Sequence, residues 1–207
     1  MPEVPNDLTT LHRQVMACSW CSLSQSRTLA VPGAGDPEAQ LMFVGEAPGF
    51  HEDRQGLPFV GPAGQLLDEL LEGIGLDRSE VFITNIVKCR PPGNRDPLQP
   101  EIEACSPYLS KQVELIAPKI VATLGRFSMA RFLDSGESIT RVHGRPRRVA
   151  GRLVMPLIHP AAALRQDRYR EVLKEDFQRL KRLLTGELEV PGDGSDSQAS
   201  SEQLSLF

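Results

Sequence analysis

The 207-residue chain has no run of about 18 consecutive apolar residues, so it predicts no membrane-spanning helix. Its N-terminal stretch, MPEVPNDLTTLHRQ, lacks both a basic and an apolar segment, so we expect no signal peptide and a cytoplasmic protein. Two nucleotide-binding signatures are also missing. No Walker lysine follows the Gly-rich loop at residues 44–61, and no G-x-G-x-x-G begins at Gly45. These absences weigh against a nucleotide-binding α/β protein, which stays an alternative.

The net charge of −4 gives only a weak argument against nucleic acid, because the charge is unevenly spread. Residues 186–207 hold five acidic side chains and no Lys or Arg. By contrast, RVHGRPRRVAGR (141–152) holds five arginines, Arg141 and Arg145 among them, and no acid. Such a run favours contact with a phosphate backbone, and the alternative is a solvated surface loop. We interpret His143, within this run, as a surface or phosphate-contacting residue.

Alternating strand and helix patterns predict an α/β layered fold with a largely parallel sheet. Hydrophobic residues make up 40% of the chain, enough for the core of one domain, which we place at residues 1–185. Short apolar runs bounded by Gly, Pro or polar residues predict strands at 39–45, 81–89, 119–125 and 152–160. Helical patterns occupy 61–75, 100–118, 125–134 and 167–184. The Gly/Ser/Asp-rich segment 186–207 is expected to be disordered.

Several polar or glycine residues fall at the ends of the predicted strands. They are Gly45–Gly49, Asn85, Gly125 and His159. Because ligands of such sheets bind outside the carboxyl ends of the strands, we expect one pocket lined by these separate segments. The loop after the first strand also carries Glu46 and Glu52, which would repel a phosphate.

Four cysteines, one close pair and two scattered residues, suggest a metal site: Cys18, Cys21, Cys89 and Cys105. In a cytoplasmic protein structural disulfides are not expected. Zinc ribbons usually join two close pairs, so this spacing suits a [4Fe–4S] cluster at least as well as zinc. From spacing alone the cluster, zinc and no metal all stay open.

Three segments carry a family resemblance. GEAPGFHEDRQGLPFVGPAGQLL, TNIVKCRPPGNRDP and HPAAALR, with four cysteines in this order, resemble the family 4 uracil-DNA glycosylases, bacterial and archaeal enzymes with an iron–sulfur cluster. The match runs from about Leu8 to Leu184. It implies a three-layer α/β/α sandwich with a mostly parallel four-stranded sheet, and a [4Fe–4S] cluster on the four cysteines. It further implies a monomeric, nucleoid-associated enzyme that flips uracil out of single- or double-stranded DNA and leaves an abasic site, the first step of base excision repair.

The resemblance also implies roles for the pocket residues. Asn85 has a donor and an acceptor, which can pair with O4 and N3–H of uracil. Phe59 would stack on the base. Pro58 before it and Gly61 shortly after it suggest an exposed loop aromatic, and a core aromatic beside Val60 is the alternative. His159 would donate to uracil O2, and the backbone at Gly45 and Ala47 would approach the base.

Two carboxylates of the loop have different expected roles. By resemblance Glu52 lies near uracil C5, where it could exclude the thymine methyl group, and it is the better candidate to orient water. Glu46 is expected to hold the loop through backbone N–H groups. A related branch of the superfamily carries a catalytic Asp or Asn where this chain has Ala47, so the general base stays open. Both carboxylates could instead be solvated.

The remaining residues of the resemblance contact DNA. Asn94 matches a position near the site, and residues 161–165 would enter the minor groove, where Leu164 and Arg165 fill the gap left by the base. Without an evident Schiff-base lysine, we expect a monofunctional enzyme. The other alternative is a non-catalytic iron–sulfur DNA-binding module or electron carrier.

The C-terminal QLSLF resembles the short motif by which bacterial repair and replication proteins dock on the sliding clamp. Gln203 would fill a polar subsite, and Leu204, Leu206 and Phe207 an apolar pocket. The acidic tail would then act as a tether that raises the effective concentration. The alternative is that this end packs on its own domain.

Overall fold

The computed structural model describes residues 4–133 and 136–190, and its centre is one mixed sheet. The strand order is β1-β3-β2-β4-β6-β5. The four central strands run parallel: β3 (Phe82–Asn85), β2 (Leu41–Gly45), β4 (Ile120–Leu124) and β6 (Arg152–Leu157). They are the four strands that the apolar runs predicted. The sheet has six strands, because two short edge strands pair antiparallel with it: β1 (Ala34–Gly35) and β5 (Arg147–Val149).

The two edge strands carry no apolar run, which is why the sequence pattern missed them. β1 has two residues, one of them a glycine, and β5 lies inside the arginine-rich segment. Two of the predicted strands were also too long. β3 ends at Asn85 and β6 at Leu157, so the apolar residues beyond them belong to the loops of the site.

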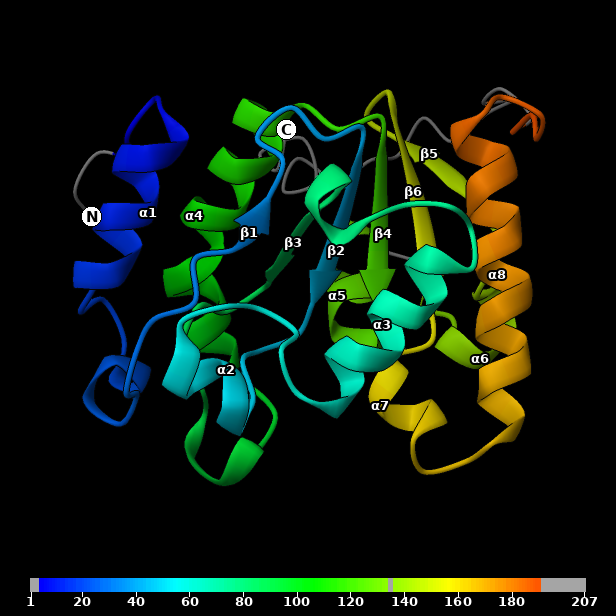
Figure 1. The fold of residues 1–207 in the computed structure, drawn as a ribbon. Coiled ribbons are helices and arrows are strands. Elements are labelled where there is room, and N and C mark those ends of the chain that lie inside the picture. Colours follow the sequence, from blue (N-terminus) through cyan, green and yellow to red (C-terminus); the bar gives the residue numbers. More distant parts are fainter. Residues whose placement is uncertain (1–3, 134–135, 191–207) are drawn as a thin grey trace.

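Helices cover both faces of the sheet (Figure 1). One face packs against α1 (Leu8–Ala17), α4 (Gln99–Ile116) and α5 (Arg126–Phe132), and the other against α3 (Pro62–Glu72) and α8 (Arg168–Leu184). Each strand feeds both cores because side chains alternate along it: in β2, Met42 and Val44 join the first core, and Leu41 and Phe43 the second. The three-layer arrangement is confirmed.

The helix α1 was not predicted, because it buries only Leu11 and Val15 and its polar face is long. Asp7 caps it by accepting a hydrogen bond from the Thr10 N–H at 2.8 Å. The predicted helix around Pro107 is confirmed as α4. Within the described ranges, no helix combines the length and apolar character that crossing a membrane requires.

Short helices gather where the parallel strands end. Figure 1 shows α2 (Phe50–Gln55) and α7 (Pro160–Ala163) at the lower end of the molecule, beside the carboxyl ends of β2 and β4. The strand register brings Gly45 level with Asn85, the last residues of two neighbouring strands. The fold thereby collects the ends of β2, β3 and β6 at one edge. The domain boundary at residue 185 stays a prediction.

Candidate active site

A cavity of about 430 Å³ opens at the carboxyl edge of the sheet. Its walls come from the loop after β2, the end of β3, the segment 91–95, and the residues that follow β6. This volume is typical of a site for a small organic ligand. The cavity brings together most of the predicted site residues: Glu46, Ala47, Glu52, Phe59, Asn85, Asn94, His159 and Arg165.

Asn85, the last residue of β3, has a buried amide that faces this cavity. The residue is 1% exposed, and its Oδ1 accepts no hydrogen bond from any residue that the structure describes. A buried acceptor left unsatisfied costs about 1–3 kcal/mol. A structural asparagine in a strand would have this oxygen hydrogen-bonded within the protein. The Asn85 Oδ1 is therefore placed to accept a hydrogen bond from a ligand.

Gly45 makes room for this amide. A Cβ added at Gly45 would lie 2.4 Å from Asn85 Oδ1 and 2.7 Å from the ring of Phe59. The sequence predicted that the Gly45 backbone approaches the base. The structure adds that position 45 must be glycine for packing, because any side chain there would displace both Asn85 and Phe59. Gly64 has a similar relation to Phe59, whose carbonyl oxygen would lie 1.8 Å from an added Cβ.

Phe59 lines the cavity from a strained backbone. Its φ is 51°, in the left-handed region that a bulky residue seldom adopts, and its ring lies 5.6 Å from the His159 ring at an interplanar angle of 28°. Arg78 fixes this turn by donating to the carbonyl oxygens of Phe59 and Pro58. The expectation of an exposed aromatic was wrong. Phe59 is only 6% exposed, because Gly45 and Gly64 let it sink into the second core.

His159 follows β6 and begins α7. Its Nδ1 accepts a hydrogen bond from the Ala161 N–H at 3.1 Å, so the ring proton is on Nε2 in the neutral form. Burial lowers the pKa of His159 to about 4, and the negative charge of Glu52 opposes this shift only in part. His159 is therefore a neutral imidazole at neutral pH, with one N–H free to donate.

Glu52, in the first turn of α2, holds the loop together. Its carboxylate accepts hydrogen bonds from three backbone N–H groups: Gly49 at 3.1 Å, and Val60 and Gly61 at 2.9 Å each. The role of loop holder had been given to Glu46, and this assignment was wrong. The reason is that α2 turns Glu52 back towards both ends of the loop, which the sequence spacing does not reveal.

Glu46 instead lies in the cavity wall with a perturbed carboxyl group. Burial, reinforced by the charge of Asp96, raises the pKa of Glu46 to about 7, and Arg126 partly opposes the shift. Arg126 and Asp96 are themselves joined by an ion pair of 2.6 Å. No hydrogen bond to the Glu46 carboxylate is present among the described residues. A carboxyl group with a pKa near neutrality can exchange protons at working pH.

The Pro-rich segment after β3 is fixed by ion pairing. Arg95 donates to both oxygens of Glu101, at 2.9 and 2.7 Å, and Leu98 N–H donates to the same carboxylate at 2.8 Å. Hydrogen bonding from Arg95 lowers the pKa of Glu101 to about 2. Asn94, at a φ of 55°, lines the cavity and accepts from Arg90 Nε at 2.7 Å.

The predicted DNA-contacting residues fall into two groups. Arg165 lines the cavity, and Leu164 beside it is exposed. Arg141, in α6 (Ile139–Val142), and Arg145 are exposed outside the cavity. His143, expected to be a surface or phosphate-contacting residue, is instead paired within the protein: its Nδ1 lies 2.7 Å from Oδ2 of Asp176, a buried residue of α8.

The four cysteines converge although 87 positions separate the first from the last. Cys18, Cys21, Cys89 and Cys105 all line one small cavity between the N-terminal segment, the residues after β3, and α4. N–H groups point at the sulfur atoms: Arg27 Nη1 lies 2.9 Å from Cys89 Sγ, and Lys88 N lies 3.3 Å from Cys105 Sγ.

The spacing of these thiols bears on which metal group they could hold. Within the described part of the chain, no three Cys, His, Asp or Glu side chains are close enough to bind one ion. Zinc needs all its sulfur ligands about 2.3 Å from one centre, whereas a cluster of several atoms needs them around a larger volume. Burial raises the pKa of Cys105 to about 12, the direction expected for a thiol in apolar surroundings. The arrangement fits a cluster better than zinc.

Lys88 is a buried residue that the sequence did not single out. It is 1% exposed, and its ammonium group donates to Thr84 Oγ1 at 2.6 Å, to the Asn85 carbonyl at 2.7 Å and to Gln112 Oε1 at 2.7 Å. Burial lowers the pKa of Lys88 to about 7. A lysine in an apolar strand run could have drawn attention, because lysine is seldom buried without partners.

Comparisons with known proteins agree with this geometry. Residues 32–181 match the family model described as the uracil DNA glycosylase superfamily. The chain is 48% identical over 187 residues to the type-4 uracil-DNA glycosylase of Sulfurisphaera tokodaii, covering 86% of this chain and 85% of that protein. It is 48% identical to the type-4 enzyme of Saccharolobus solfataricus (87% and 88% covered) and 44% identical to that of Archaeoglobus fulgidus (85% and 92% covered).

Proposed function

The chain belongs to the uracil DNA glycosylase superfamily, within its type-4 enzymes, and is a uracil-DNA glycosylase; from this premise we propose how its residues remove the base. The enzyme hydrolyses the N-glycosidic bond of uracil in DNA and leaves an abasic site, the first step of base excision repair. The observation that carries the assignment of the pocket is the unsatisfied amide oxygen of Asn85.

Asn85 reads the edge of the base. Its Oδ1 accepts from uracil N3–H, and its Nδ2 donates to uracil O4. Cytosine presents the opposite pattern, an acceptor at N3 and a donor at position 4. An amide in the orientation that pairs with uracil would therefore place donor against donor and acceptor against acceptor on cytosine. Selection therefore rests on two hydrogen bonds made by this one amide.

His159 stabilises the leaving base. The bond from Ala161 N–H to Nδ1 leaves Nε2–H to donate to uracil O2 as negative charge develops there. The low pKa of His159 keeps the ring neutral, so it acts as a hydrogen-bond donor and not as a general acid. One preorganised donor of this kind is typically worth about 3–4 kcal/mol.

The loop after β2 completes the pocket. Phe59 provides the stacking surface, and the backbone of Ala47 lies along the base. Glu52 keeps Gly49 and Gly61 together and, from its place in the cavity wall, excludes a methyl group at C5. Since both Glu52 oxygens already accept backbone N–H groups, we assign the orientation of water to Glu46, whose carboxylate has no such bonds.

The enzyme is monofunctional in this account. Lys88 lines the cavity of the cysteines and not the active-site cavity, and its ammonium group donates to Thr84, Asn85 and Gln112. Its ammonium group is therefore not available to attack the sugar. Water attacks the oxocarbenium-like sugar instead, and a nearby carboxylate favours that positive charge.

The four cysteines hold a [4Fe–4S] cluster in this proposal, supported by their common cavity and by the N–H groups directed at their sulfur atoms. The bound group acts as a cross-link. It ties the N-terminal segment to the residues after β3 and to α4, close to the loop that carries Asn94. Zinc would require the sulfur atoms to be closer together.

The DNA lies across the carboxyl edge of the sheet. Leu164 and Arg165 fill the gap left by the flipped uridine, since Leu164 is exposed and Arg165 borders the cavity. Asn94 borders the same cavity, and Arg141 and Arg145 contact phosphates farther out. Substrates are uracil-containing single- and double-stranded DNA, and the enzyme works as a cytoplasmic, nucleoid-associated monomer.

The C-terminal motif is proposed as a sliding-clamp ligand. Gln203, Leu204, Leu206 and Phe207 lie outside the described residues, so this proposal rests on the sequence QLSLF alone. Residues 186–207 would serve as the tether and residues 1–185 as the glycosylase domain. Clamp binding that survives deletion of residues 203–207 would refute the proposal.

One assay tests the assigned function. The full-length protein is incubated with an oligonucleotide that contains a single uracil and is then treated with alkali. Cleavage is expected only at the uracil, and an oligonucleotide with thymine or cytosine at that position is the control. A folded sample that produces no alkali-labile site at uracil would refute the function.

A further inference from the structure

Phe50 is an exposed aromatic at the rim of the cavity that the proposed chemistry does not use. It is the first residue of α2 and directly follows Gly49, which lines the cavity. Its side chain is 43% exposed. Neighbouring aromatics behave differently: Phe43 is fully buried and Phe59 nearly so. An aromatic kept in water beside an active site is a candidate contact for the ligand.

Two arginines lie against the Phe50 ring. The guanidinium carbon of Arg54, one turn later in α2, is 4.4 Å from the ring centroid, and that of Arg90, from the segment after β3, is 5.2 Å away. Both distances are within the range of cation–π attraction. Among residues 4–133 and 136–190, neither guanidinium forms an ion pair with a carboxylate.

Two nearby carboxylates, of Glu52 and Asp53, accept backbone N–H groups and form no ion pair with either guanidinium within the described ranges. Glu52 accepts the backbone N–H groups of its own loop, and Asp53 is buried and accepts from Thr28 N–H at 2.8 Å. The result is a surface of one aromatic ring and two guanidinium groups that form no ion pair with a described residue, which we call the Phe50 platform.

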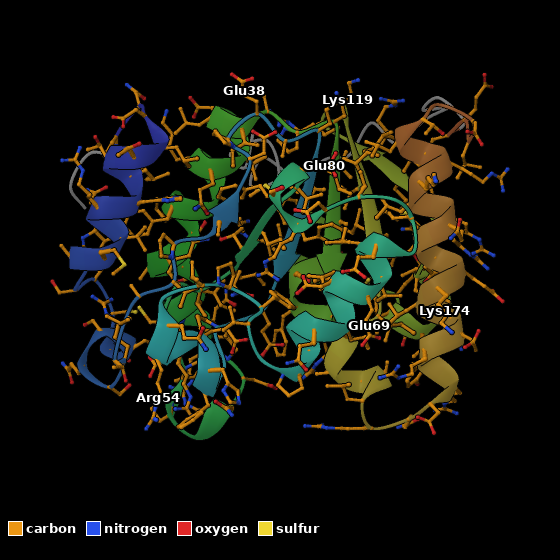
Figure 2. The ribbon with its side chains drawn as sticks, in the orientation of Figure 1. Glu38, Arg54, Glu69, Glu80, Lys119 and Lys174 are labelled. Atoms are coloured by element: carbon orange, nitrogen blue, oxygen red, sulfur yellow. The ribbon has the colours of Figure 1, made fainter. Side chains whose placement is uncertain are left out.

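The Phe50 platform continues into the cavity. Arg90 Nε donates to Asn94 Oδ1 at 2.7 Å, and Asn94 borders the cavity itself. Figure 2 shows Arg54 at the lower end of the molecule, where the strands end, whereas Glu38, Glu80 and Lys119 lie at the opposite end. A DNA strand that delivers a base into the cavity must pass this rim.

We propose that the Phe50 platform binds the nucleotide next to the uracil on an unpaired strand, with that base stacked on Phe50 and its phosphate held by Arg54 and Arg90. The proposal rests on the glycosylase function above. Aromatic rings combined with arginines bind single strands of any sequence, since every base has a stacking face. In a duplex the neighbouring base is already stacked within the helix. The Phe50 platform should therefore matter more for single-stranded than for double-stranded substrate.

Binding to an uncleavable oligonucleotide tests this directly. The probe is a fluorescent single strand of thymidines with one central tetrahydrofuran, followed by anisotropy with the full-length chain. Phe50→Ala should weaken binding at least about fivefold, and Phe50→Trp should keep it near the wild-type value. Leu57→Ala is the matched control, because Leu57 is an apolar residue, 48% exposed in the loop after α2, and it does not line the cavity. It should bind like the wild type.

Salt dependence separates stacking from charge. Arg54→Met should reduce the slope of log affinity against log salt by about 0.7, the value for one phosphate contact on a single strand, whereas Phe50→Ala should leave the slope unchanged. With the complementary strand added, the Phe50→Ala defect should shrink.

The outcomes distinguish the two levels of inference. A wild-type protein that does not remove uracil would refute the proposed function. A wild-type protein that removes uracil, together with a Phe50→Ala variant that binds the single strand as tightly as the wild type, would overturn the Phe50 platform alone. An equal loss on single and double strands would also overturn it.

Discussion

The unsatisfied amide of Asn85 predicts that removing a functional group will stabilise the protein. In Asn85→Leu, a side chain of similar shape replaces the amide, so the desolvation cost of the buried Oδ1 is removed. That cost is about 1–3 kcal/mol, and we expect the free energy of unfolding to rise by about 1–2 kcal/mol. For a domain of this size the midpoint of thermal unfolding should rise by about 2–8 °C.

The same substitution should nearly abolish activity. Uracil O4 and N3–H would meet methyl groups in a buried pocket and stay unsatisfied, which costs about 3–4 kcal/mol. This corresponds to a loss of about 100- to 1000-fold in kcat/KM. The measurements are thermal and urea unfolding for stability, and release of uracil from a labelled oligonucleotide for activity.

The neighbouring residue Thr84 provides the control. It is as buried as Asn85 and lies in the same strand, but its hydroxyl donates to the Pro32 carbonyl at 2.9 Å and accepts from Lys88 at 2.6 Å. Thr84→Val should therefore destabilise the fold by about 1–3 kcal/mol. If Asn85→Leu destabilised the fold as much as Thr84→Val, Asn85 would be a structural strand residue and the reasoning would be refuted.

Three further predictions concern the loop and the cysteines. Burial raises the pKa of Glu46 to about 7, and Glu46 must lose its proton to orient water, so kcat/KM should rise with pH between about 6 and 8. The Glu46→Gln variant should have a low kcat/KM that does not change with pH over this range. A Glu46→Gln variant with the pH profile of the wild type would exclude Glu46 from this role. In the Glu52→Gln variant an amide NH₂ group would face a backbone N–H donor, so the midpoint of thermal unfolding should fall by about 2–8 °C. Hydrogen exchange of the Val60 and Gly61 amides should become faster. Unchanged exchange rates at these two amides would contradict the loop-holding role of Glu52. Cys89→Ser should lose visible iron–sulfur absorbance and bound iron and unfold at lower temperature, and a wild-type protein that carries zinc instead would refute the cluster.

Some site residues can be identified from the local sequence pattern, and others cannot. Asn85 and His159 stand out in the sequence because each interrupts or ends an apolar run, and strand ends of parallel sheets meet at one edge. The cysteines stand out by their type and their close pair. These signals depend only on neighbouring residues in the sequence, so they can be read without knowledge of the fold.

Other features depend on contacts between distant segments. Glu46 and Glu52 share a loop and a residue type, and only the turn of α2 decides which one meets the backbone N–H groups. The burial of Phe59 depends on glycines at positions 45 and 64. Lys88 is tolerated in the core because Gln112 and Thr84, from α4 and β3, satisfy its ammonium group.

By itself the sequence determined the alternation of strands and helices, the four central strands, the family and the residue types available for chemistry, because these follow from periodicity and from motifs read along the chain. The tertiary structure decided the roles. It made Glu52 the holder of the loop and Glu46 the perturbed acid. It left the Asn85 Oδ1 without a hydrogen bond from the described residues, fixed the His159 proton on Nε2, and gathered the cysteines around one cavity. The physical reason is that burial, hydrogen-bond satisfaction and pKa are set by neighbours far apart in the sequence.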